Sequence, residues 1–139
     1  MGKSIFEKTV DQVASKKNSH EKELQGEIKK ALDAFISATE IDPTDVFFYQ
    51  NGGEVEIEDL ITTKGVMSFE WGILVQHEFK DFEVRVDVNA VKKAFYNDDD
   101  EVVLSLGEYD PDIPVFDKNV FMDKLIEELN NKVAQEASS

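Results

Sequence analysis

The chain has 139 residues, no cysteine, and 30 acidic against 15 basic residues, which gives a formal net charge of −15 at pH 7. A hydrophobic fraction of 41% excludes a wholly disordered chain, and the lack of cysteine excludes disulfides, thiolate zinc sites and cysteine nucleophiles. We expect one folded domain over residues 1–139, with a helical segment 1–40 and an acidic segment 41–139 that holds a sheet and a last helix.

The chain is predicted to begin with a short helix. Ser4 and Glu7 have the spacing of a capping box, in which each side chain accepts a hydrogen bond from the backbone amide of the other residue. Phe6, Val10 and Val13 then recur at helical spacing. This pattern indicates an amphipathic helix with its apolar side chains on one face.

A second helix is predicted to follow the polar residues 15–19, with an N-cap at Asn18 or Ser19 and an end near Thr39. Its apolar stripe consists of Leu24, Ile28, Ala31, Leu32 and Phe35. Two N-terminal helices are expected on this basis, although the two could also merge into one long helix. A stripe of this kind usually faces the core, and less often it docks on another chain.

A β-hairpin is predicted where the hydrophobic period changes from helical to alternating, after Asp42-Pro43. Asn51-Gly52 is a strong turn signal because both central positions of the turn need a positive φ. Residues 46–50 and 54–58 are the expected strands. The expected cross-strand pairs are Phe48 with Val55, Val46 with Ile57, Tyr49 with Glu54 and Phe47 with Glu56.

The next strand has the clearest alternation in the chain and is predicted to bury one face. Its apolar positions are Met67, Phe69, Trp71, Ile73, Val75, His77 and Phe79. A turn at Lys80-Asp81 should return the chain along residues 82–88. This register opposes Val84 to His77, Val86 to Val75, Val88 to Ile73, and Glu78 to Glu83, the last an unfavourable pair of like charges.

Three further elements complete the prediction. Residues 90–96 could form a helical turn, and residues 102–106 should form a strand. A last helix should start at Asp117 or Asn119, with frayed residues 134–139 at its end. The expected fold class is α+β: an antiparallel β-meander of about five strands, with two N-terminal helices and one C-terminal helix packed on one face.

Negative charge is unevenly placed along the chain. Residues 1–40 have equal numbers of acidic and basic side chains, whereas residues 41–139 account for the whole net charge of −15. Such a field repels nucleic acid and anionic membranes and favours basic partners. Arg85 is the only arginine, so the bidentate contacts that bind phosphate and guanine are scarce. We expect a cytoplasmic protein with no membrane contact, since no hydrophobic stretch is long enough to cross a bilayer.

The acidic residues do not match a known metal or catalytic pattern. An EF-hand loop started at Asp98 or Asp110 lacks an oxygen ligand at its fifth position. His20 and His77 are far apart in sequence and have no cysteine beside them, which argues against zinc. We therefore predict no enzymatic activity, no cofactor and no metal ligand set, with a weak cation site at residues 98–101 left open.

These observations favour a non-enzymatic module whose acidic surface binds a basic surface on a protein partner. The predicted partner-binding residues are Glu54, Glu56, Glu58, Asp59, Asp98, Asp99, Asp100, Glu101, Glu108, Asp110 and Asp112. A more specific form of this hypothesis is that the protein is an inhibitor, which mimics nucleic acid and binds a nucleic-acid-binding protein. Alternate strand positions lie about 7 Å apart, close to the phosphate spacing along a single strand. A merely solvated strand face is the alternative for Glu54, Glu56 and Glu58.

Two other functions stay open at this stage. The protein could be a structural subunit of a larger assembly, such as a viral one, or a homo-oligomer in which the neutral N-terminal helices dock on neighbouring subunits. It could also bind a small ligand between the sheet and the last helix, in a pocket lined by Trp71, Phe69 and Phe121.

Overall fold

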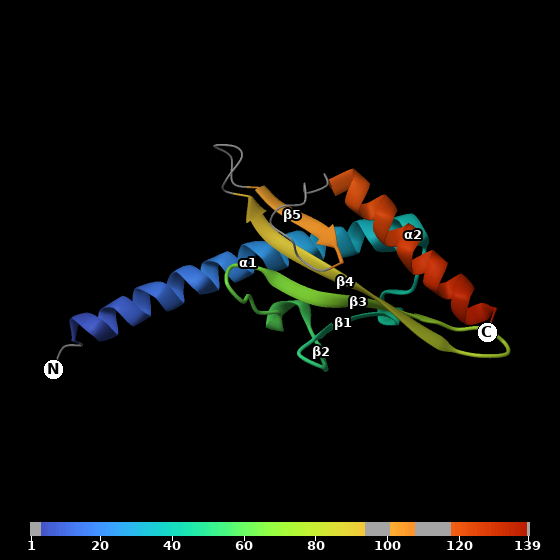
Figure 1. The fold of residues 1–139 in the computed structure, drawn as a ribbon, viewed down its shortest axis with the longest axis horizontal. Helices are drawn as coiled ribbons and strands as arrows, with labels where there is room; N and C mark the ends of the chain where they lie inside the picture. The colour runs from blue at the N-terminus through green and yellow to red at the C-terminus, as the bar shows by residue number, and fades with distance from the viewer. Residues whose placement is uncertain (1–3, 94–100, 108–117, 139) are drawn as a thin grey trace.

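The computed structural model describes residues 4–93, 101–107 and 118–138 (Figure 1). Five antiparallel strands form one sheet in the order β2-β1-β3-β4-β5, and two helices cover one face of it (Figure 1). The elements in chain order are α1 (Ile5–Thr39), η1 (Pro43–Asp45), β1 (Val46–Gln50), β2 (Gly53–Val55), η2 (Ile57–Asp59), β3 (Met67–Val75), β4 (Phe82–Lys93), β5 (Glu101–Leu106) and α2 (Lys118–Ala137). The α+β class and the antiparallel sheet are confirmed.

The two predicted N-terminal helices are one helix. The capping box at its start is present, with the Glu7 amide donating to Ser4 Oγ at 3.2 Å and the Ser4 amide donating to Glu7 Oε2 at 3.1 Å. The polar residues 15–19 do not interrupt α1, because they contain neither proline nor glycine and include lysines, which favour helix. The helix ends at Glu40, which has a left-handed φ of 59°.

The first part of α1 lies apart from the sheet. Residues 5–19, here called the N-terminal overhang, are all exposed, and in Figure 1 they project beyond the edge of the sheet. Contact with the body begins at His20, whose Nε2 lies 3.1 Å from the Gly65 carbonyl oxygen. Burial begins at Leu24 and continues at Ile28 and Phe35. Only the second predicted apolar stripe therefore faces the core.

The hairpin at Asn51-Gly52 forms as predicted, and both turn residues have a positive φ, 55° and 81°. Phe48 pairs with Val55 and Tyr49 with Glu54. The predicted strand 54–58 is wrong beyond Val55, because the chain turns into the 3₁₀ helix η2 and buries Ile57 there. The predicted pair of Val46 with Ile57 is absent from the β1–β2 register.

The predicted register of β3 with β4 is wrong by four residues. Ile73 pairs with Val84, Trp71 with Val86 and Phe69 with Val88. β3 ends at Val75, and a loop over residues 76–81 replaces the predicted two-residue turn, with the His77 amide donating to Asp81 Oδ1 at 3.2 Å. An even shift leaves the same side chains on the same face, so alternation alone cannot distinguish the two registers.

Two consequences of this shift correct the sequence-based expectations. His77 and Phe79 were predicted on the buried strand face, but both are exposed and lie beyond the end of β3. The like-charge pair of Glu78 with Glu83 does not form, because Glu83 pairs with Leu74.

After residue 89, the described residues differ from the prediction at the start of this segment and at the end of the last helix. β4 continues to Lys93 because Ala90 and Val91 pair with Leu104 and Val103 of β5, so the predicted helical turn is wrong for residues 90–93. β5 and α2 occupy the predicted strand and last helix, but α2 stays helical to Ala137, so the predicted fraying is wrong for residues 134–137. The remainder of the predicted turn, residues 94–96, lies outside the described residues.

The core lies between the sheet and the two helices, and aromatic rings fill its centre. The Trp71 ring is fully buried and makes edge contacts with Phe35 at 5.3 Å and Phe48 at 5.1 Å between ring centroids. Phe69 and Phe121 are also buried. All three aromatic side chains expected at a ligand pocket belong to the continuous core, and Phe121 also lines a cavity of about 260 Å³ between α1, β5 and α2.

Candidate functional site

The face of the sheet opposite the helices, here called the open face, has a row of acidic side chains. The register pairs Glu54 with Tyr49, Tyr49 with Glu70, and Glu70 with Asp87, so these four residues lie in line across β2, β1, β3 and β4. We call Glu54, Glu70 and Asp87 the acidic row. Adjacent strands are about 4.8 Å apart, so the row concentrates negative charge over a short distance.

The closest pair in this row is electrostatically unfavourable. Glu70 and Asp87 are direct cross-strand neighbours, an arrangement that destabilises a sheet. Arg85 offsets part of this repulsion, because its Nη1 lies 3.8 Å from Glu70 Oε2 and its Nε lies 3.3 Å from Glu83 Oε1. The open face thus combines one guanidinium with the carboxylates of the acidic row and of Glu83.

Tyr49 and Arg85 form a stacked pair in the middle of the open face. The Arg85 guanidinium carbon lies 3.6 Å from the centre of the Tyr49 ring, and the Tyr49 hydroxyl donates a hydrogen bond to Glu83. Burial of the ring, together with the hydrogen bond and the charge of Glu83, raises the pKa of Tyr49 to about 12. The hydroxyl therefore stays protonated at neutral pH and keeps donating to the carboxylate.

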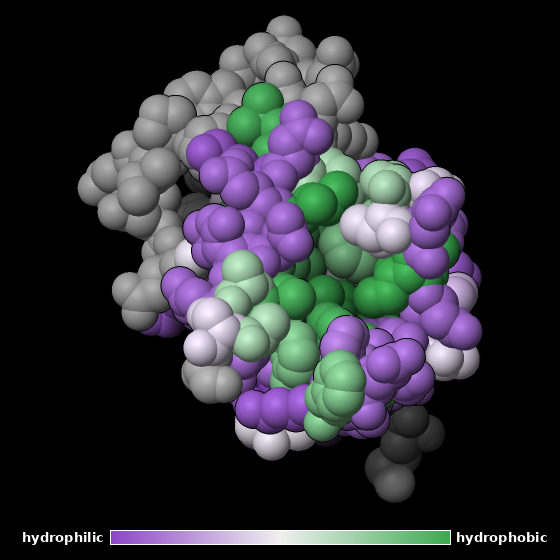
Figure 2. All heavy atoms as spheres, turned by 90° about the vertical axis from the view of Figure 1, so that its right-hand side faces the viewer, coloured by the Kyte–Doolittle hydropathy of each residue, from purple (hydrophilic) through white to green (hydrophobic). Residues whose placement is uncertain are grey.

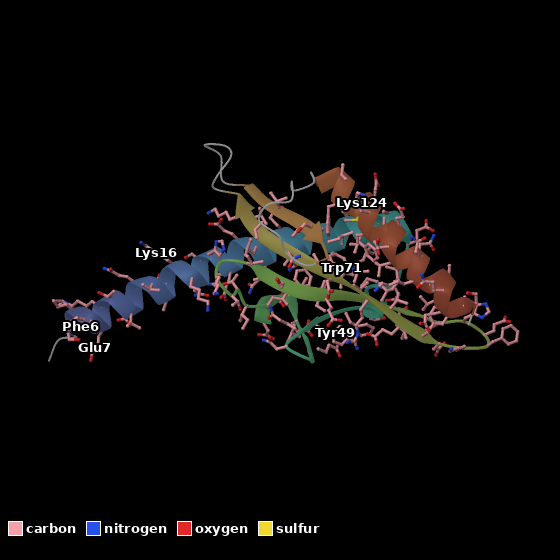
Figure 3. The ribbon with its side chains drawn as sticks, in the orientation of Figure 1. Phe6, Glu7, Lys16, Tyr49, Trp71 and Lys124 are labelled. Atoms are coloured by element: carbon pink, nitrogen blue, oxygen red, sulfur yellow. The ribbon has the colours of Figure 1, made fainter. Side chains whose placement is uncertain are left out.

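Gly72 makes this stacking possible. A Cβ atom at this position would lie 3.1 Å from Tyr49 Cε2 and 3.4 Å from Arg85 Cγ, both tighter than ordinary contact. Gly72 is the pairing partner of Arg85, and its missing side chain leaves room for the Tyr49 ring to lie across β3. Figure 3 shows Tyr49 on one side of the sheet and Trp71 on the side of the helices.

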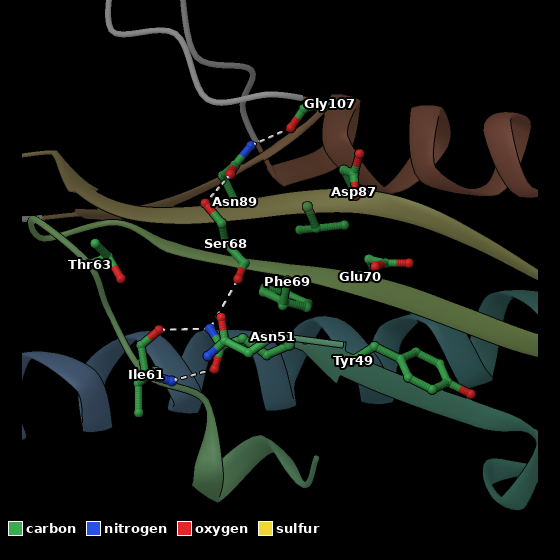
Figure 4. A pocket seen from close by; sticks show the side chains of 12 residues that line it. Tyr49, Asn51, Ile61, Thr63, Ser68, Phe69, Glu70, Asp87, Asn89 and Gly107 are labelled. Carbon is green, nitrogen blue, oxygen red and sulfur yellow. Dashed lines mark hydrogen bonds between the residues drawn. The ribbon is translucent and has the colours of Figure 1, made fainter. Parts of the chain in front are cut away.

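A pocket of about 380 Å³ lies beside the acidic row (Figure 4). Asn89 is buried in its wall and links two strands, since its Oδ1 accepts from Ser68 Oγ at 2.6 Å and its Nδ2 donates to the Gly107 carbonyl at 2.5 Å. Gln50 holds the opposite wall, because its amide nitrogen donates to the Ile61 carbonyl at 2.8 Å. The other lining residues are Tyr49, Asn51, Thr63, Phe69, Glu70, Asp87 and Val88.

Four of the predicted partner-binding residues lie on the described surface near β2. Glu54 belongs to the acidic row, Glu56 follows β2 directly, and Glu58 and Asp59 lie in η2; all four are exposed. Within the described ranges, no lysine or arginine forms an ion pair with any of them. Their charge is therefore directed to solvent.

The other predicted partner-binding residues cannot be placed in this site. Glu101 is the first residue of β5. Six predicted residues lie outside the described ranges: Asp98, Asp99, Asp100, Glu108, Asp110 and Asp112. Residues 98–100 of the cation site left open also lie outside the described ranges.

Sequence reasoning missed three carboxylates of the open face: Glu70, Glu83 and Asp87. Alternation placed Glu70 on the polar face of its strand, and the hairpin already paired Tyr49 with Glu54. What was lacking was the register of β3 with β4, since only the correct register brings Asp87 next to Glu70. With the correct strand pairing, the acidic row could have been predicted from the sequence.

Metal binding finds no support in the described part of the chain, where no group of three or more His, Asp or Glu side chains could hold an ion. The two histidines serve other contacts. His20 joins α1 to the Gly65 loop, and the exposed His77 ring stands 5.6 Å from the Phe79 ring.

Comparisons with protein-family models, with curated proteins and with solved structures yield no match. Among the described residues, no helix is long and apolar enough to cross a membrane.

Proposed function

We propose that this protein is a non-enzymatic interaction module whose open face binds a basic surface of a protein partner. The observation that carries the proposal is the acidic row, in which Glu70 and Asp87 are held side by side despite their mutual repulsion. A cationic side chain of the partner, placed against Glu70 and Asp87, would relieve that repulsion. The relief would favour binding.

The surroundings of the row support the same function. Tyr49 provides an aromatic surface within the row, and the neighbouring pocket has polar walls fixed by Asn89 and Gln50. A lysine or arginine chain could lay its methylene groups against Tyr49 and direct its charge at Glu70 and Asp87. The exposed carboxylates of Glu56, Glu58 and Asp59 would add long-range attraction and raise the association rate.

Binding of a hexalysine peptide, followed by fluorescence anisotropy, tests the proposal. The double variant Glu70→Gln/Asp87→Asn should bind the peptide about three- to tenfold more weakly, in line with about 1 kcal/mol for exposed charges. The double variant Asp33→Asn/Asp123→Asn, at exposed positions of α1 and α2, removes the same number of charges; it is the matched control and should keep most of the affinity. Equal losses in the two variants would show that the open face has no special role.

Salt dependence provides a second criterion. Exposed charge pairs are screened over about 8 Å at physiological ionic strength, so the affinity should fall steeply between low salt and 0.5 M. Affinity that stays constant over this range would remove charge as the basis of binding.

Nucleic-acid mimicry receives less support from the geometry. The predicted spacing required Glu54, Glu56 and Glu58 to alternate along one strand, but β2 ends at Val55 and Glu58 lies in the 3₁₀ helix η2. Competition by a DNA duplex for the same basic partner would test this form of the proposal.

A second candidate function is that of a subunit in a larger assembly. The observation that favours it is the N-terminal overhang, whose Ile5, Phe6, Val10 and Val13 side chains are 68%, 80%, 65% and 61% exposed. Apolar side chains in a row on one helix face are a common docking surface. Light scattering coupled to sizing chromatography tests this function, and a mass that stays at 15.8 kDa at all concentrations would exclude self-assembly.

A further inference from the structure

The molecule has an apolar surface at each of its two ends. At one end is the N-terminal overhang, which stands free of the body with its side chains in solvent (Figure 3). At the other end, where the C-terminus lies, Figure 2 shows hydrophobic residues gathered in a hollow between hydrophilic ones. We propose that the overhang of one copy of this chain docks in the hollow of a second copy.

The hollow has the composition of a helix-binding groove. It has a volume of about 410 Å³ and lies where the end of α1, the end of β3 and the second half of α2 meet. Its apolar lining includes Phe35, Ile41, Ile73, Val75, Leu129 and Val133. Several of these side chains are only half-buried, so a docked helix would remove further apolar surface from water.

The overhang has the matching pattern. Phe6, Val10 and Val13 follow the i, i+4, i+7 spacing with which amphipathic helices fill apolar grooves. The overhang covers 15 residues, or about 22 Å of helix at 1.5 Å per residue, which is long enough to present all three side chains to one groove.

Charge complementarity points to a copy of the same chain as the occupant. The overhang, residues 5–19, contains three lysines and two acidic residues, whereas residues 20–139 contain 11 basic and 28 acidic residues. The overhang thus has a small net positive charge, in contrast to the strongly negative remainder of the chain. The hollow is lined on one side by Asp42 and Asp45, so acidic groups stand where Lys8, Lys16 or Lys17 of a docked overhang could reach them.

The symmetry of the resulting assembly follows from the position of the two surfaces. The overhang and the hollow are different surfaces, so a single contact between two copies leaves one overhang and one hollow unused. These remaining surfaces either dock on each other and close a reciprocal dimer, or bind further copies and produce a larger ring or a linear polymer. The inference rests on the second proposed function, self-assembly, and names the surfaces that would perform it.

Complementation between two full-length variants tests the inference. Phe6→Asp/Val10→Asp removes the docking stripe, and Asn130→Arg places a bulky charge at an exposed position that lines the hollow. Each variant alone should be monomeric or self-associate at least tenfold more weakly than the original chain. Because each variant keeps one functional surface, an equimolar mixture should form a heterodimer with a single interface. Light scattering coupled to sizing chromatography measures all these masses.

Ser15→Asp is the matched control, since at 100° per residue it lies on the helix face opposite Phe6 and Val10, and it should assemble like the original chain. Circular dichroism shows whether each variant is folded, so a misfolded hollow variant is replaced by Asp45→Lys at the rim of the same hollow. A monomeric original chain at all concentrations would overturn self-assembly itself. Oligomers that survive Asn130→Arg, or a mixture that fails to form heterodimers, would overturn only the assignment of the hollow.

Discussion

The guanidinium of Arg85 lies flat over the ring of Tyr49, 3.6 Å from the ring centre, on the exposed face of the sheet. Arg85 also contacts Glu83, which accepts the hydrogen bond of the Tyr49 hydroxyl. These side chains join β1 to β4 across β3 on the open face of the sheet. The properties of this cluster can be measured directly.

Tyr49 should titrate later than an ordinary tyrosine. Burial and the neighbouring Glu83 raise its pKa from 10.0 to about 12. Because the pKa is higher in the folded state, the protonated Tyr49 hydroxyl stabilises the fold. This stabilisation is fully present below pH 10 and is lost as the pH rises from 10 to about 12. The ultraviolet absorbance of tyrosinate measures the titration.

Two variants control this titration. Tyr49→Phe should abolish the late component among the three tyrosines of the chain, and Glu83→Gln should shift it to lower pH. A late component that persists in Tyr49→Phe would assign it to another tyrosine and contradict the prediction.

Gly72→Val should lower the free energy of unfolding by about 1–3 kcal/mol, the usual range for overpacking. A Cβ at this position already crowds Tyr49 Cε2 at 3.1 Å, and valine adds two methyl groups, so the stacked pair must separate. Urea unfolding measures the loss. Gly26→Ala is the matched control: nothing lies within 4 Å of its Cβ, and alanine in a helix should raise stability by up to about 1 kcal/mol.

Trp71→Ala should be strongly destabilising, by about 3–5 kcal/mol, because the ring is fully buried against Phe35 and Phe48. Trp71→Phe should cost much less. In the described structure the Trp71 Nε1 donor is buried without a hydrogen-bond acceptor, so phenylalanine removes an unsatisfied polar group together with part of the ring. Unfolding followed by circular dichroism compares the two, and equal losses would show that Nε1 is in fact satisfied.

Asn89→Ala should lower the free energy of unfolding by about 1–3 kcal/mol. Asn89 is buried at 2% exposure and bonds both Ser68 and the Gly107 carbonyl, so truncation removes two hydrogen bonds and the link between β3, β4 and the end of β5. Ser68→Ala removes only one of these bonds and should cost less in the same urea experiment. The reverse order would contradict a central role for Asn89.

Ser4→Ala should loosen the start of α1 without changing the global stability. Loss of the N-cap costs a helix about 1 kcal/mol, but the overhang it caps is exposed and contributes nothing to the core. Amide hydrogen exchange over residues 5–12 should become faster in the monomeric state, while the urea midpoint stays constant. A fall in the midpoint would show that the overhang is coupled to the folded body.

The sequence by itself determined the local features of this protein. Capping-box spacing located the start of α1 at Ser4, positive-φ residues located the turn at Asn51-Gly52, and alternation identified which side chains of β3 face the core. Each of these properties depends on residues only a few positions apart, where backbone stereochemistry and periodicity act.

Only the tertiary structure decided which residues meet across strands and which apolar stripe finds a core. The β3–β4 register that places Asp87 beside Glu70 differs from the predicted one by four residues, and both registers satisfy the same alternation. Likewise, Phe6 and Val10 have the same helical pattern as Leu24 and Ile28, yet only the latter two reach the sheet. Periodicity selects a face, whereas packing against distant parts of the chain selects the partner of that face.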